Sequence, residues 1–190
     1  VRINNIHDIN NPKLVEDLGK KTDIIYFDGS MNQSRFQDYI NCSPKMLKCT
    51  YPETEWFFED RCKTNISILK KHFNVEIVNS KKYNELKYTL SKDLKVRPNS
   101  GLIAIIDLLG FPIKELYITG IDFYLHHPDH EDWDVDTLRQ YLKGGDNGDV
   151  HDINKQFKFF KNLKHNESRI KTDKVLKEYL TDPQYETVKF

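Results

Sequence analysis

One histidine stands where the chain could use a general base. His151 follows the glycine-rich segment 144–148 and directly precedes a predicted helix. An imidazole titrates near neutral pH, so a histidine at such a junction can take a proton from a substrate hydroxyl. The alternative is a histidine that only caps the helix or lies on the surface. Gln156 follows five residues later, slightly more than one helical turn further on.

A small polar tripeptide could bind an anion. Asn99, Ser100 and Gly101 open an apolar segment that predicts a helix. The first N–H groups of a helix have no partner inside it, and the helix dipole is positive there, so this position suits phosphate. Gly101 would let the backbone approach a ligand closely. The alternative is that Asn99 or Ser100 caps the helix and binds nothing.

The polar segment 125–150 contains metal-ligand residue types, including His126, His127, His130 and Glu131. Pro128 interrupts helical i,i+4 spacing, and the pattern matches no established ligand motif. We therefore expect a solvated loop or lid without a metal. Asp132 and Asp134 form an Asp-x-Asp pair in the same segment. If that pair held Mn²⁺, it would indicate a transferase that uses nucleoside-diphosphate sugars.

Composition limits the class of protein that can carry these groups. The 190 residues suffice for one sizeable domain. Lys plus Arg and Asp plus Glu are both 29, and this zero formal charge disfavours nucleic acid and polybasic membrane surfaces as partners. The three cysteines lack CxxC spacing, so we expect no disulfide framework, no zinc site and a reducing compartment. No apolar run is long enough to be a transmembrane helix.

Apolar runs alternate with segments of helical spacing. Predicted strands lie at 23–27, 46–50, 75–78 and 115–120, and predicted helices at 34–40, 63–73, 83–94, 102–109, 153–163 and 173–180. This alternation predicts an α/β fold with a mostly parallel central sheet flanked by helices. Ligands of such sheets bind beyond the carboxyl ends of the strands. Binding residues are therefore expected at 28–30, 79–80 and 120–124.

Several segments, taken in chain order, carry a family resemblance. Arg-Ile-Asn at 2–4, followed by Gly-Lys-Lys-Thr-Asp at 19–23, resembles the end of the large sialylmotif of family 29 glycosyltransferases, the sialyltransferases. Arg-Pro-Asn-Ser-Gly-Leu-Ile-Ala at 97–104 and Lys-Glu-Leu-Tyr-Ile-Thr-Gly-Ile-Asp-Phe-Tyr at 114–124 resemble the small sialylmotif. The ending Gly-Ile-Asp-Phe-Tyr at 120–124 is also similar to a segment of the bacterial sialyltransferases of family 42. His151 with Gln156 resembles the very small motif, a His followed five residues on by Glu.

The resemblance implies a single Rossmann-like catalytic domain over residues 1–190, a sialyltransferase-type variant of the GT-A fold, with an N-terminal βα unit that would precede Val1. It implies an inverting, metal-independent transfer of sialic acid or a related keto-sugar, without a cofactor, from a CMP-sugar donor to a glycan or glycolipid hydroxyl. His151 would be the catalytic base. The donor nucleotide would contact Asn4, Asn99, Ser100, Gly101, Gly120 and Asp122. The acceptor or a lid would involve Tyr124, Tyr141 and His126.

The chain also departs from the family pattern. Gln156 stands in place of Glu, and the third, His-Tyr-Tyr-type motif is not recognisable, with Tyr141 its loose match. Residues 102–119 lack the Cys that joins the large and small motifs in animal enzymes, which favours a cytoplasmic, microbial or viral-type relative. The Golgi lumen is the alternative if a preceding segment carries an anchor. Two other functions stay open: an inactive nucleotide- or glycan-binding relative, and a metal-dependent UDP- or GDP-sugar transferase that uses Asp132 and Asp134.

Overall fold

The chain divides into two compact units, Val1–Tyr83 and Asn84–Phe190. The structure, a computed structural model, describes residues 1–3, 21–30, 32–52, 60–90, 92, 96–121, 123 and 151–182. Each unit combines helices with parallel strands, so the predicted α/β class is confirmed. The described strands form two sheets, whereas the sequence predicted one central sheet. A single domain over residues 1–190 stays a prediction.

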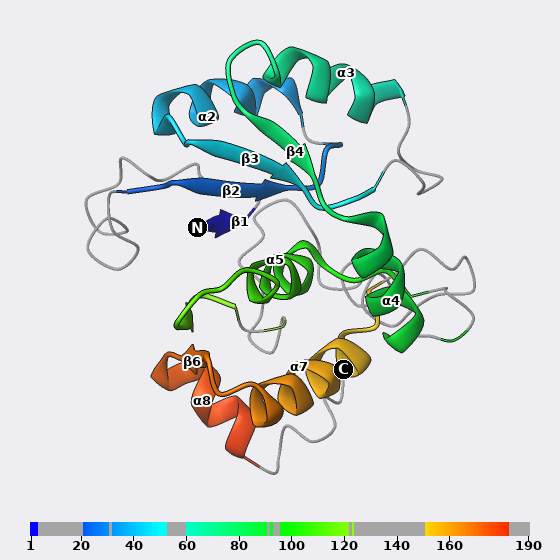
Figure 1. The fold of residues 1–190 in the computed structure, drawn as a ribbon, viewed down its shortest axis with the longest axis vertical. Helices are drawn as coiled ribbons and strands as arrows, with labels where there is room; N and C mark the ends of the chain where they lie inside the picture. Colours follow the sequence, from blue (N-terminus) through cyan, green and yellow to red (C-terminus); the bar gives the residue numbers. More distant parts are fainter. Residues whose placement is uncertain are drawn as a thin grey trace, which may run out of the picture. The chain divides into compact units, whose positions relative to one another are not determined.

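The first unit is built on a four-stranded parallel sheet in the order β1-β2-β3-β4 (Figure 1). Its strands are β1 (Arg2–Ile3), β2 (Ile24–Phe27), β3 (Met46–Cys49) and β4 (Val75–Ile77). Ile25 lies opposite Leu47, which in turn lies opposite Val75. Because side chains alternate along a strand, these residues share one face of the sheet.

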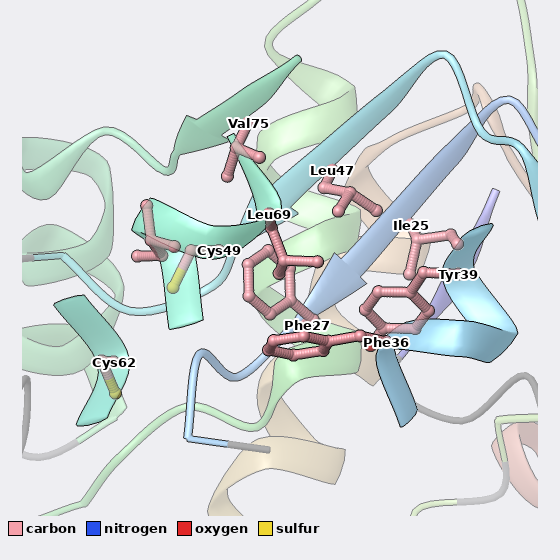
Figure 2. Close-up of a cluster of buried hydrophobic side chains, with 10 residues drawn as sticks. Ile25, Phe27, Phe36, Tyr39, Leu47, Cys49, Cys62, Leu69 and Val75 are labelled. Carbon is pink, nitrogen blue, oxygen red and sulfur yellow. The ribbon is translucent and has the colours of Figure 1, made fainter. Parts of the chain in front are cut away.

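Helices follow the strands, and two of these helices cover that apolar face. The 3-10 helix η1 (Gln33–Arg35) and α2 (Phe36–Cys42) follow β2, α3 (Asp60–Leu69) follows β3, and α4 (Ser80–Leu90) follows β4. Figure 2 shows side chains of β2, β3 and β4 packed against those of α2 and α3. The buried cluster consists of Ile25, Phe27, Phe36, Tyr39, Leu47, Cys49, Cys62, Ile66, Leu69 and Val75. The core of the first unit therefore lies between the sheet and this pair of helices.

The second unit contains α5 (Ser100–Leu109), β5 (Leu116–Ile118), α7 (Ile153–Asn166), β6 (Ile170–Thr172) and α8 (Lys174–Thr181). β5 and β6 form a two-stranded parallel sheet in which Leu116 lies opposite Ile170. Phe123 packs against α7, with its ring centroid 5.6 Å from that of Phe157 and 5.1 Å from that of Phe160. Among the described helices of both units, none is long and apolar enough to cross a membrane.

All predicted strands and helices are present, with shifted ends. The largest shifts are in α3 and α4, each of which begins three residues earlier than predicted and ends four residues earlier. β1 and β6 were not predicted. With two and three residues respectively, they are too short for an alternating pattern to be recognised.

The turn after β2 is tightly packed. Gly29 has φ +78°, in the left-handed region, and a Cβ built there would lie 3.0 Å from the Cys49 Sγ and 3.3 Å from the Cys62 Sγ. The Nδ2 of Asn65, on α3, donates to the Gly29 carbonyl at 2.9 Å. The turn therefore requires glycine both for its backbone conformation and for lack of space.

Gly29→Ala is expected to destabilise the protein more than Gly120→Ala. Alanine in the left-handed region costs roughly 1–2 kcal/mol at either position. At position 29 the methyl group also meets two sulfur atoms, and overpacking of this kind costs roughly 1–3 kcal/mol more. Gly120 is the matched control, because its φ is +68° and no atom of the residues that the structure describes, its chain neighbours aside, lies within 4 Å of the built Cβ. Urea unfolding measures both losses, and equal losses would contradict the packing argument.

Candidate functional site

The start of α7 fixes the position of His151. Asp152 is the N-cap, and its side chain accepts from the Lys155 N–H at 2.9 Å. The Asp152 carbonyl accepts from the Gln156 N–H at 3.0 Å, the first backbone bond of the helix. His151 immediately precedes this cap and is buried, with 7% of its surface exposed. The capping alternative is therefore wrong for His151, because Asp152 is the cap, and the surface alternative is wrong because the ring is buried.

A backbone carbonyl determines which ring nitrogen of His151 carries hydrogen. The Nδ1 atom lies 2.8 Å from the carbonyl oxygen of Arg97. A carbonyl oxygen can only accept, so Nδ1 donates and carries the hydrogen. In the neutral ring the lone pair then resides on Nε2. Nε2 is thus the atom of His151 that can accept a proton.

Burial also determines the charge of His151. It disfavours the imidazolium and lowers the pKa of His151 to about 4, against the opposing effect of the hydrogen bond to the Arg97 carbonyl. The positive charge of Arg97 lowers the pKa further. His151 is therefore neutral at physiological pH, the state that a general base needs.

Gln156 joins the start of α7 to the segment that precedes α5. Its side chain is fully buried, and both ends of the amide form hydrogen bonds. Oε1 accepts from the Asn99 N–H at 2.8 Å, and Nε2 donates to the Arg97 carbonyl at 3.2 Å. An ionised Glu in the same place could accept from Asn99 but could not donate to Arg97. The amide therefore matches this backbone better than the Glu of the family motif would.

The first turn of α5 is positioned by its own N-cap and by Gln156 of α7. Asn99 is its N-cap, with φ −73° and ψ 159°, and its Oδ1 accepts from the Leu102 N–H at 2.8 Å. The capping alternative is thus correct for the Asn99 oxygen. Ser100 is buried and Gly101 is partly exposed. If the first turn of α5 binds a phosphate, as the sequence predicts, it must therefore do so through its backbone N–H groups and helix dipole rather than through the Asn99 oxygen.

Gly120 is held separately, at the carboxyl end of β5. Its N–H donates to the Asp173 Oδ2 at 3.3 Å, while Asp173 Oδ1 accepts from the Leu176 N–H at 2.7 Å and caps α8. The Asp173 N–H donates to the Ile118 carbonyl at 3.1 Å. Asp173 thus ties the end of β5 to the start of α8. The sequence placed Asp173 at the start of a predicted helix but gave no sign of this link.

The structure brings some of the predicted site residues together. His151, Gln156 and the backbone of Arg97 and Asn99 form one hydrogen-bonded group, which we call the Arg97 cluster. Arg97 was not predicted as a site residue, and no sequence signal could have shown its part, because every residue has a carbonyl. Ser100, Gly101 and Gly120 are described above, and the other predicted residues lie outside the described residues, namely Asn4, Asp122, Tyr124, His126, His127, His130, Glu131, Asp132, Asp134 and Tyr141. Within the described residues, no three His, Cys, Asp or Glu side chains are grouped so that they could hold a metal ion.

The carboxyl ends of the first unit's strands carry a second set of polar groups. Residues 28–30 follow β2 and residues 79–80 follow β4, as predicted. Asn65 supports the first of these segments, and its Oδ1 accepts from the Gln33 Nε2 at 3.3 Å. Asn65 was missed, although it lies three residues after Cys62 and four before Leu69, on the buried side of α3. An Asn in the buried stripe of a helix is the signal that could have revealed it.

Comparisons of the chain with protein-family models, curated proteins and solved structures find no match. The likeness to sialyltransferases therefore depends on the motif residues of this chain alone. Among these, the structure describes 2–3, 21–23, 97–104, most of 114–124, and 151–156. The contacts of the Arg97 cluster are the geometric facts that bear on their function.

Acidification is expected to destabilise the protein through His151. The unfolded chain binds a proton near pH 6.5 and the folded one only near pH 4, so folding stability is lost as pH falls below about 6.5 and the loss is complete below about 4. The expected loss from this one group is about 2 kcal/mol between pH 7 and pH 5. Urea unfolding of wild type and His151→Asn, whose amide can still donate to Arg97, measures the difference in pH dependence.

The control for this measurement is His165→Asn, which removes an exposed histidine from the last turn of the same helix. It should leave the pH dependence of wild type in place. An identical pH dependence in wild type and His151→Asn would show that His151 is not the group responsible.

Proposed function

We propose that the chain is an inverting, metal-independent glycosyltransferase of the sialyltransferase type. It would transfer sialic acid, or a related keto-sugar, from a CMP-sugar to a hydroxyl of a glycan or glycolipid. The proposed fold is a Rossmann-like variant of the GT-A type in a single domain. The parallel sheets and the succession of strands and helices support it, since they agree with that class.

One observation carries the proposal. The Arg97 cluster links Asn99, one of the residues that the family resemblance assigns to the donor, to His151, which the resemblance makes the catalytic base. The link runs through Gln156 and the Arg97 carbonyl. His151 and Arg97 are 54 residues apart along the chain, so no local constraint requires this contact. A neutral histidine with its lone pair on Nε2, adjacent to the start of an apolar helix, supports a base next to an anion-binding position.

The proposed chemistry balances within these groups. The acceptor hydroxyl oxygen attacks the anomeric carbon of the sugar while the bond from that carbon to the CMP phosphate oxygen breaks on the opposite face. The hydroxyl proton passes to Nε2 of His151, and CMP leaves with the electron pair of the broken bond. General-base assistance of this kind contributes typically about 10²–10⁴ in rate.

The chain itself supplies positive charge for the leaving phosphate. The N-terminus of α5 carries the positive end of a ten-residue helix, and the Arg97 charge is close enough to lower the pKa of His151. The start of α7 is a second helix N-terminus, and Gln156 holds it to the segment before α5. Such fixed dipoles stabilise negative charge that develops during a reaction. Nucleotide contacts by Asn4, Gly120 and Asp122, and acceptor contacts by Tyr124, Tyr141 and His126, stay predictions.

The state of the cysteines supports a reducing, cytoplasmic compartment for this enzyme. Cys42, Cys49 and Cys62 form no disulfide with one another. Cys49 and Cys62 are buried in the core of the first unit, and burial raises the pKa of the Cys49 thiol to about 12. Thiols of this kind serve as apolar packing and are unreactive.

Calorimetric titration tests the donor class. CMP is expected to bind the wild-type chain equally well with and without EDTA, and UDP and GDP are expected to bind more weakly. His151→Ala should keep the CMP affinity but lose transfer from CMP-sialic acid by about 10²–10⁴-fold, because only proton removal is impaired. Lys158→Ala, an exposed position on α7, is the matched control.

Two results would contradict the proposal. Full transfer activity in His151→Ala would remove the assignment of the base. Binding of UDP or GDP only in the presence of a divalent cation, without binding of CMP, would replace the donor class.

The pH dependence of transfer provides a separate prediction. Because the pKa of His151 is about 4, kcat/KM should stay constant as pH falls through 6.5 and decline only near pH 4. Rates of CMP-sialic acid turnover between pH 4 and 8 measure this. A decline centred near pH 6.5 would show that the essential base is a histidine in a more exposed setting.

A further inference from the structure

The segment that precedes α5 is extended but belongs to neither described sheet. Pro98 has no N–H, and a residue that precedes proline, here Arg97, is restricted to extended conformations. Asn99 is extended as well, with φ −73° and ψ 159°. In an extended segment the carbonyl of one residue and the N–H two residues later point to the same side, where a neighbouring strand would pair with them. The carbonyl of Arg97 and the N–H of Asn99 are such a pair.

A single side chain takes the place of that neighbouring strand. The Gln156 amide donates to the Arg97 carbonyl at 3.2 Å and accepts from the Asn99 N–H at 2.8 Å. The amide is fully buried, and its backbone lies in the first turn of a capped helix, so the side chain starts from a fixed position. The two bonds together fix the direction of the Arg97 carbonyl, because rotation of that carbonyl would break its bond to the Nε2 of Gln156.

The same carbonyl oxygen is also the partner of His151. Its second lone pair accepts from the Nδ1 of His151 at 2.8 Å, so two donors share one oxygen. A change in the direction of that carbonyl would alter both bonds. The hydrogen on Nδ1 therefore depends on a carbonyl whose direction Gln156 fixes.

We propose that Gln156 is a positioning residue, whose amide orients the Arg97 carbonyl and thereby keeps the His151 hydrogen on Nδ1 and the lone pair on Nε2. The tautomer is inferred from the contacts of the Arg97 cluster and does not depend on the proposed function. The catalytic consequence, that Nε2 faces the reaction as the base, rests on the proposed function. The residue type at position 156 is then selected by backbone groups, and an amide satisfies both of them.

Two substitutions separate the two halves of the amide. Gln156→Glu has nearly the same shape, and an ionised carboxylate would keep the bond from the Asn99 N–H while presenting an oxygen to the Arg97 carbonyl. Gln156→Met removes both the donor and the acceptor at similar length. Gln37→Glu is the matched control, because Gln37 is an exposed residue of α2 that undergoes the same chemical change.

The tautomer can be read directly by ¹⁵N NMR of histidine-labelled protein. The protonated and unprotonated nitrogens of a neutral imidazole differ widely in ¹⁵N shift, and the His151 signals are those that disappear in His151→Asn. Wild type and Gln37→Glu are expected to show hydrogen on Nδ1. Gln156→Glu and Gln156→Met are expected to show a reduced Nδ1–H population at His151, with the other histidine signals unchanged.

Three results would overturn the inference. The first is hydrogen on Nε2 in wild type. The second is an unchanged Nδ1–H population in the folded Gln156 variants. The third is loss of folding in both Gln156 variants while Gln37→Glu folds, because Gln156 would then act on the fold as a whole.

Kinetics separate the inference from the proposed function. If both hold, Gln156→Glu should reduce kcat for CMP-sialic acid turnover about 10²-fold, as a displaced base does, and leave the KM for the donor nearly unchanged. A tautomer change in a protein that turns over no CMP-sugar would leave the inference standing and remove the function. Normal turnover of CMP-sialic acid by Gln156→Glu, with the His151 tautomer unchanged, would overturn the inference and leave the proposed function standing.

Discussion

The carbonyl oxygen of Arg97 accepts hydrogen bonds from two side chains of the α7 region, the Nδ1 of His151 and the Nε2 of Gln156. Both donors are buried, so losing either bond would leave a polar group without compensation, at a cost of about 1–3 kcal/mol. The tautomer of His151 and the direction in which α5 begins both depend on this atom. Its own direction is constrained by Pro98, which limits the backbone of the residue before it.

Helix N-caps, together with this carbonyl, fix the positions of the predicted site residues. The N-caps of α5, α7 and α8 are Asn99, Asp152 and Asp173, and in each case the side-chain oxygen accepts from the N–H three residues later. A cap of this type contributes about 1 kcal/mol. Its larger effect here is geometric, because the cap sets the residue at which each helix begins. His151 immediately precedes one cap and Gly120 is tied to another, so helix ends determine where the predicted site residues lie.

Residue types and spacing predicted the elements well, because apolar runs such as Ile24–Phe27 and the apolar stripe of α5 reflect burial directly. They identified His151 and Gln156 as a pair but could not identify their partner, since a backbone carbonyl leaves no mark on residue type. Asn99 was open to two interpretations, a cap or a ligand, because both use the same side chain. β6 was not predicted, because three residues are too few to show the alternation of a strand. Its pairing with β5 is a tertiary contact.

The length of chain between the two halves of the Arg97 cluster affects when the cluster can form. Arg97 and His151 are separated by 54 residues, and Asn99 and Gln156 by 57. At about 5–20 residues per second, a ribosome needs roughly 3–10 s to synthesise that interval. During this time the start of α5 already exists while its buried partners do not, and water must occupy their hydrogen-bonding positions. The Arg97 cluster therefore cannot be completed before the start of α7 has been synthesised, and a chain ending before Gln156 cannot assemble it.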